Sequence, residues 1–145
     1  MAIDISKRKL HNHQTDKELM LLRNIAFHEI RSVKNNDEFV AHIRRIILEN
    51  MKEEGFGVPV LCKMTCMSRT QLHVKLNSLT RHSTSQYIKS IRIQRACELL
   101  GETNLKISRI SKEIGIDSLP YFSRIFKKEV GLSPHKYRKK YRSEQ

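Results

Sequence analysis

The chain has 145 residues, of which 39% are hydrophobic, so it can form one domain or two small ones with modest cores. Lys and Arg number 28 against 15 acidic residues, and the formal net charge is +13 at pH 7. This excess favours a polyanionic partner, although charge alone does not separate DNA from RNA or an anionic membrane. More than half of it lies in residues 106–145.

Several classes of protein are disfavoured by what the sequence lacks. No apolar run is long enough to span a bilayer, no signal peptide is visible, and three cysteines make no disulfide framework. We therefore expect a cytoplasmic protein with no membrane partner. Paired acids, a phosphate loop, a nucleophile motif and a metal-ligand cluster are also missing, so we expect no enzyme activity, metal or cofactor.

Two cysteines near a histidine raise a metal or redox hypothesis. Cys62 and Cys66 are four residues apart and His73 follows them. Alternatively, the two cysteines serve as small packing residues, and this interpretation is favoured. Cys97 is expected in a core.

The N-terminal segment, residues 1–36, is predicted to hold a polar, basic tail over 1–14 and then a helix. Thr15 to Glu18 has capping-box spacing and opens a helix that extends to about Lys34. Its apolar stripe is wider than one neighbour needs: Leu19, Met20, Leu21, Leu22, Ile25, Ala26, Phe27, Ile30 and Val33. Residues 15–34 either self-associate or meet an upstream sensor domain, or they pack on their own domain.

Residues 37–82 are predicted to form a first helix-turn-helix subdomain. A turn at Asn35-Asn36 and a cap at Asp37 begin a helix that ends near Glu53. Its inward residues are Phe39, Val40, Ile43, Ile47 and Met51. A short helix follows from Val58 to about Cys66, with Val60, Leu61 and Met64 on its apolar side. A second capping box, Ser68 to Gln71, starts a helix to about Leu79, with Leu72, Leu76 and Leu79 opposite Thr70, His73, Val74 and Asn77.

Residues 83–100 are predicted to be a linker helix, with Gly101 as its C-terminal stop. Its apolar stripe changes face halfway along: Tyr87, Ile88 and Ile91 share one side, and Ile93, Ala96, Cys97 and Leu100 share the opposite one. A helix serving a single core keeps one stripe. This helix is therefore expected to pack against two bodies.

Residues 101–145 are predicted to form a second helix-turn-helix subdomain with a basic C-terminus. After a loop over 101–104, a short helix runs from Ile107 to Ile114 and ends at Gly115. The next helix is capped by Asp117 or Ser118 and ends at Gly131. Its inward residues are Phe122, Ile125, Phe126 and Val130; its outward residues are Pro120, Ser123, Arg124, Lys127 and Lys128. A last short helix from Ser133-Pro134 carries Tyr137.

No strand pattern occurs, so the fold class is all-α: two helix-turn-helix subdomains joined by a central linker helix, with an extra N-terminal helix. Each subdomain repeats a short helix, a tight turn and a capped helix with one polar or basic face. In a helix-turn-helix unit the second helix enters the DNA major groove. A linker of about 17 residues spans about 25 Å. One chain could then read two adjacent groove segments without a symmetric dimer.

From about Phe39 to Arg142 the chain resembles the DNA-binding domain of the AraC/XylS family of transcription regulators. The residues that carry the resemblance are Ser68 to Leu76, Tyr87-Ile88, Arg92, Ala96, Ile110, Gly115-Ile116, Tyr121 to Lys128, Gly131, Ser133-Pro134 and Tyr137-Arg138. The first subdomain looks most like the output domains of hybrid two-component regulators. The resemblance implies sequence-specific binding to double-stranded DNA and activation through contact with RNA polymerase.

The resemblance also assigns site residues, most of which the helical faces indicate independently. Base contacts are expected at Thr70, His73, Val74, Leu119, Pro120, Ser123 and Arg124. Phosphate contacts are expected at Ser68, Arg69, Lys75, Ser118, Lys127 and Lys128. Three positions depart from the family pattern: Arg81 replaces glycine, Ile116 replaces an aromatic residue, and Val74 replaces a basic one.

Two alternative functions stay open on the sequence. A nonspecific nucleic-acid-binding protein would use only the basic surface. A helical protein-interaction adaptor would use the two motifs as a scaffold.

Overall fold

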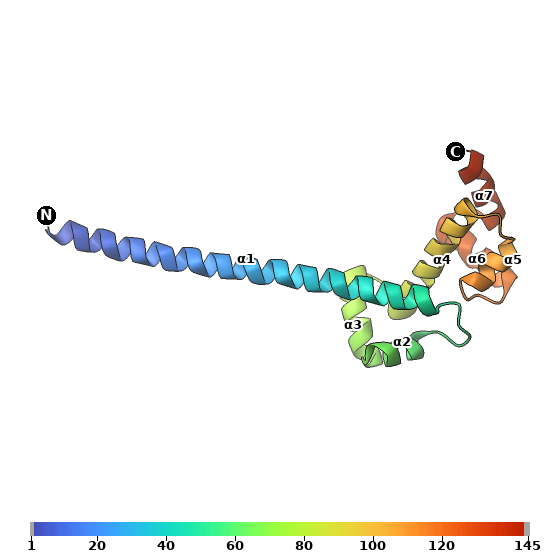
Figure 1. Cartoon of the computed structure of the whole chain (residues 1–145), viewed down its shortest axis with the longest axis horizontal. Coiled ribbons are helices and arrows are strands. Elements are labelled where there is room, and N and C mark those ends of the chain that lie inside the picture. Colours follow the sequence, from blue (N-terminus) through green and yellow to red (C-terminus); the bar gives the residue numbers. More distant parts are fainter. Residues whose placement is uncertain (1, 144–145) are drawn as a thin grey trace. The chain divides into compact units, whose positions relative to one another are not determined.

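The computed structural model describes the backbone of residues 2–143 and the side chains of residues 14–29 and 31–142. This part of the chain is all-α, as predicted, and contains no strand. None of its helices combines the length and apolarity needed to cross a membrane. The elements, labelled in Figure 1, are α1 (Ala2–Asn50), α2 (Val58–Thr65), α3 (Arg69–Thr80), α4 (Thr84–Glu102), α5 (Ile107–Glu113), α6 (Leu119–Val130) and α7 (Pro134–Ser143).

Helix α1 is continuous, which corrects the predicted N-terminal organisation. It begins at Ala2 and passes through Asn35 and Asn36, so the separate tail, the turn and the Asp37 cap are wrong. The chain has no Gly or Pro before Gly55. Asparagine costs a helix only about 0.7 kcal/mol relative to alanine, too little to end one on its own.

The chain divides into two compact units, Met1–Phe39 and Val40–Gln145. In the first unit, the apolar side chains on α1 are exposed to solvent. Leu19, Met20, Leu22, Phe27 and Val33 each keep between 50% and 67% of their surface accessible. The partner expected for residues 15–34 therefore stays a prediction.

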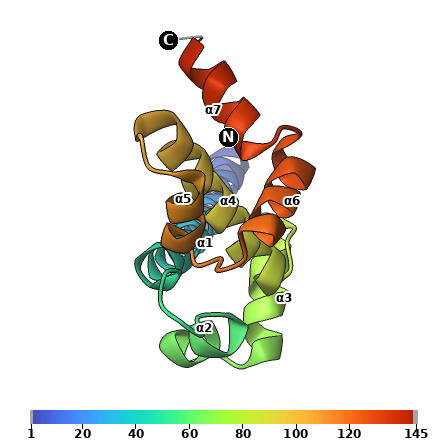
Figure 2. The same ribbon diagram turned by 90° about the vertical axis from the view of Figure 1, so that its right-hand side faces the viewer.

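The second unit is organised around α4, which contacts α3, α5 and α7. Both predicted apolar faces are used, because Tyr87, Ile88 and Ile91 are buried and so are Ile93, Ala96 and Leu100. Cys97 is half-buried. Figure 2 shows α3 and α6 on one side of α4, with α5 and the C-terminal end of α1 on the other. The prediction that α4 serves two bodies is confirmed.

Gly101 does not stop α4, which continues to Glu102 and is capped by Thr103. The Thr103 hydroxyl donates to the Leu99 carbonyl oxygen at 2.6 Å. A side chain at position 101 would meet the Tyr141 ring, whose Cε1 lies 2.8 Å from the place of a Cβ. The glycine therefore marks close packing of α7 on α4, and the predicted loop at 101–102 is wrong.

The short helix α2 turns a different face inward from the one predicted. Leu61 is fully buried, whereas Val60 and Met64 are 37% and 46% exposed. Phe56 and Ile116, which the sequence did not assign to the core, are buried. Because α2 has only eight residues, a single buried leucine anchors it and periodicity says little about its other positions.

Candidate nucleic-acid interface

The start of α3 is fixed by the predicted capping box. The Ser68 hydroxyl accepts from the Gln71 backbone N–H at 3.1 Å, and the Gln71 side chain accepts from the Ser68 N–H at 3.0 Å. Two N–H groups that the helix itself leaves without partners are satisfied in this way. These two hydrogen bonds fix the backbone conformation of the first turn of α3, which carries Arg69 and Thr70.

The inner face of α3 is buried and anchors the helix, whereas its outer face is exposed to solvent. Leu72 and Leu76 are fully buried. The proposed base-contacting residues Thr70, His73 and Val74 are all exposed, as are the proposed phosphate contacts Ser68, Arg69 and Lys75. Arg81 follows with φ of 64° and donates its backbone N–H to the Asn77 carbonyl oxygen at 2.9 Å. Arg81 thus adopts an uncommon left-handed backbone conformation, as expected from this departure.

Helix α6 repeats this arrangement. The Ser118 hydroxyl accepts from the Tyr121 N–H at 3.3 Å, and Pro120 lies in the first turn. Phe122 and Phe126 are fully buried, with ring centroids 5.7 Å apart. The outer face presents seven of the assigned residues. Ser123 is half-buried, and the other six are exposed: Ser118, Leu119, Pro120, Arg124, Lys127 and Lys128.

Arg124 is held by an aromatic neighbour that sequence reasoning did not single out. Its guanidinium carbon lies 5.5 Å from the centroid of the exposed Tyr121 ring. A cation at this distance is attracted by the ring face and loses part of its freedom. The spacing of three residues on a helix places the two side chains side by side and was the signal available in the sequence.

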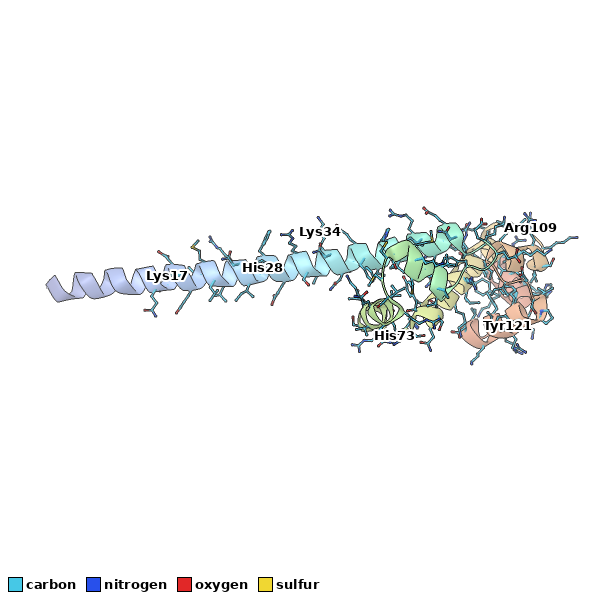
Figure 3. The ribbon with its side chains drawn as sticks, turned by 90° about the horizontal axis from the view of Figure 1, so that it is seen from below. Lys17, His28, Lys34, His73, Arg109 and Tyr121 are labelled. Atoms are coloured by element: carbon cyan, nitrogen blue, oxygen red, sulfur yellow. The ribbon has the colours of Figure 1, made fainter. Side chains whose placement is uncertain are left out.

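The two helices present their outer faces on the same side of the second unit. Figure 2 places α3 and α6 together, and Figure 3 shows His73 and Tyr121 at one edge with Arg109 at the other. Helix α4 joins the two subdomains that carry them, and its 19 residues measure about 28 Å along the axis. One turn of duplex DNA is about 34 Å.

A backbone contact joins the end of α1 to the turn between α5 and α6. Gly115 has φ of +81°, and a Cβ built there would lie 1.8 Å from the Met51 carbonyl oxygen. Beside it, Lys52 and Arg109 each reach the Glu113 carboxylate at 3.0 Å. The hydrogen bond from Lys52 lowers the pKa of Glu113. We call Met51, Lys52, Glu113 and Gly115 the interlock, because it connects the first subdomain to the second independently of α4.

Arg92 on α4 adds a second connection. Its guanidinium donates to the Phe56 carbonyl oxygen at 3.2 Å, while its Nε has no partner among the described residues. Burial lowers the pKa of Arg92, and the nearby Tyr121 hydroxyl acts in the opposite direction. The side chain lines a cavity of about 390 Å³ that also touches Gly57, Lys89 and Ile116.

The cysteines do not form a metal site with the described residues. No group of three or more His, Cys, Asp and Glu side chains able to hold a metal occurs in this part of the chain. Cys66 is exposed and ends α2 with φ of 54°, so it is not the packing residue that the sequence indicated. Cys62 is half-buried.

Comparison with known proteins agrees with this geometry. A helix-turn-helix domain family matches residues 61–140. Histidine kinase P4 of Formosa agariphila is 32% identical over 113 residues, which are 78% of this chain and 8% of the kinase. The transcriptional activator RhaR of Salmonella dublin is 32% identical over 91 residues, which are 63% of this chain and 32% of RhaR.

A solved complex resembles the second unit in structure. The DNA-binding domain of AdpA, a global transcriptional factor crystallised with a target DNA, gives a TM-score of 0.66 at 27% identity, covering 72% of this chain and 94% of that domain. The two helix-turn-helix units joined by α4 are those of a DNA-binding domain of a transcription regulator. The chain belongs to the AraC-type helix-turn-helix family, as the resemblance implied.

Proposed function

We propose that this chain reads two adjacent major-groove segments of duplex DNA, α3 in one and α6 in the other, and that it acts in the cytoplasm as a transcription activator without enzyme activity of its own. The observation that carries the proposal is that two capped helices expose polar and basic faces on one side of a single compact unit. The chain spans 8% of the kinase and 32% of the activator that it matches.

Base reading is assigned to the outer faces described above. On α3 it falls to Thr70, His73 and Val74. On α6 it falls to Leu119, Pro120, Ser123 and Arg124. Arginine can bond guanine O6 and N7 together, and stacking on Tyr121 limits the orientations of Arg124. Val74 is apolar and 60% exposed, which suits contact with a thymine methyl group.

Phosphate contacts position the protein without reading sequence. They are assigned to Ser68, Arg69 and Lys75 around α3, and to Ser118, Lys127 and Lys128 around α6. The two serines already accept a backbone N–H, so their hydroxyl protons remain available for a phosphate oxygen. Activation through RNA polymerase, and a partner for residues 15–34 that is either a second copy or an upstream sensor domain, complete the proposal.

Binding-site selection from random duplex DNA tests this function directly. We expect one site with two conserved segments about one helical turn apart. Competition with random DNA at fixed salt separates this result from the nonspecific alternative, in which only phosphates are contacted. No enriched sequence, together with a stable protein complex, would favour the adaptor.

A matched pair of charge removals sharpens the test. Lys127→Ala should lower the salt slope of binding by about one. Arg109→Ala removes the same charge from the opposite edge of the unit, where Arg109 already pairs with Glu113. The Arg109 variant should leave the slope nearly unchanged. Equal effects would show that charge acts through the whole protein and not through the proposed surface.

A further inference from the structure

The exposed stripe on the first unit contains a repeat of eleven residues. Glu18-Leu19 and Leu22-Arg23-Asn24 are followed, eleven residues later, by Glu29-Ile30 and Val33-Lys34-Asn35. Eleven residues make three turns at 3.67 residues per turn, so equivalent positions lie on nearly straight lines along the helix. A helix that carries such a repeat is suited to pairing along its length with a similar helix.

The repeat places charge on both sides of an apolar line. The line consists of Leu19, Leu22, Ala26, Ile30 and Val33. Glu18 and Glu29 run along one edge of it, about 65° from the centre, and Arg23 and Lys34 run along the other edge at a similar angle. One edge is therefore acidic and the other basic.

These four charged side chains have no ion-pair partner among the described residues, and all four are exposed. Arg23 has no acidic residue three or four positions away on its own helix. Figure 3 shows Lys17, His28 and Lys34 projecting outward from α1. The four members of the apolar line whose side chains the structure describes (Leu19, Leu22, Ala26 and Val33) are exposed, so they and the charged edges are available to a partner.

We propose that residues 15–38 pair with the same segment of a second copy, with the two helices parallel and in register. In such a pair, the acidic edge of each helix faces the basic edge of its partner, and each acidic residue lies opposite the basic residue about five positions later in the partner's sequence. Glu18 then meets Arg23 of the other copy, and Glu29 meets Lys34. An antiparallel pair would set acid against acid and base against base, which is destabilising.

This inference deepens the partner assigned to residues 15–34 and does not depend on DNA binding. In a parallel pair both DNA-binding units follow from the same end, so the dimer carries four reading helices. Met20 and Leu21 lie away from the apolar line and remain in solvent. They supply a matched control, because Met20 is 67% exposed and Leu22 is 62% exposed on the same helix.

Sedimentation equilibrium of the full chain is the first measurement. We expect a dimer of twice 17.1 kDa. Leu22→Glu should weaken dimerisation at least about tenfold, because it removes buried apolar area and adds charge to the line. Met20→Glu should leave it unchanged. A monomer, a trimer, or equal loss from both substitutions overturns the proposal, and circular dichroism checks that each variant is folded.

Charge exchange and cross-linking test the orientation. The variant with Glu18→Lys and Glu29→Lys, and the variant with Arg23→Glu and Lys34→Glu, should each dimerise poorly alone and form a heterodimer when mixed. Leu19→Cys, in a chain with Cys66→Ser, should oxidise to a dimer linked through residue 19 in both copies. A dimer that forms without this cross-link refutes the parallel register. Since none of these measurements uses DNA, their failure is distinguishable from failure of the proposed function.

Discussion

The interlock makes a quantitative prediction at Gly115. Replacing Gly115 by alanine forces a side chain into a left-handed backbone conformation, which costs about 1–2 kcal/mol. The new Cβ would also lie 1.8 Å from the Met51 carbonyl oxygen, so the two backbones must separate by more than about 1 Å. Overpacking of this kind costs a further 1–3 kcal/mol, roughly, so we expect Gly115→Ala to destabilise the protein by about 2–5 kcal/mol.

Gly131 is the matched control for this substitution. It has φ of +91°, and a Cβ built there meets nothing within 4 Å. Gly131→Ala should therefore cost only the conformational strain of about 1–2 kcal/mol. Urea denaturation of both variants measures the difference. If the two substitutions destabilise equally, the contact between Met51 and Gly115 is loose and the interlock does not hold the second subdomain in place.

Three further outcomes follow from the site and its surroundings. Arg124→Ala should relax base preference in one segment of the selected DNA site by about 1–3 kcal/mol, whereas Lys127→Ala should weaken binding to all DNA sequences alike. If Arg124→Ala instead weakens binding equally on every sequence, Arg124 is only a phosphate contact. Ser68→Ala removes the cap of α3 and should lower the free energy of unfolding, measured by urea denaturation, by about 1 kcal/mol. Ser78→Ala is the control and should leave it unchanged, because the Ser78 hydroxyl only donates to the Lys75 carbonyl oxygen within the same helix. Burial, with Cys97 adding to the effect, raises the pKa of Tyr137 to about 12. Above pH 10 the Tyr137 hydroxyl therefore loses its proton in the unfolded chain before it does in the folded protein, and stability should fall between pH 10 and 12. Tyr137→Phe should flatten that fall, and an unchanged pH slope would contradict the assignment.

The parts of the fold that short-range chemistry determines were predictable from the sequence. The capping box at Ser68 and the cap at Ser118 are contacts within one turn of helix, so residue types and spacing were sufficient to place α3 and α6. The same holds for the two faces of α4, since burial follows the helical period. The unusual conformation of Arg81 could be expected because the family that the chain resembles has glycine at this position.

The features that were missed depend on contacts between distant segments. Gly101 is of the residue type that commonly ends a helix, but it lies inside α4, where the Tyr141 ring, forty residues later, packs against it and leaves no room for a side chain. The contact between Met51 and Gly115 leaves no trace in periodicity, since it joins two backbones. The continuation of α1 through Asn35 and Asn36 was missed for the opposite reason: local turn propensity was given more weight than the absence of any Gly or Pro nearby.

The spacing of the two reading helices rests on more than the linker helix. Helix α4 sets their separation, because Ile91 is buried in its first half and Leu100 in its second. A linker helix alone fixes the distance between the two subdomains, but each subdomain could still rotate about the place where it packs on that helix. The interlock and the Arg92 hydrogen bond to Phe56 tie the first subdomain to its surroundings at points away from the α4 axis. Rotation of the second subdomain relative to the first would break the interlock, and the Arg92 hydrogen bond fixes the first subdomain on α4. The relative orientation of the two faces is therefore built into the folded domain before it meets DNA, and binding need not supply the free energy to create it.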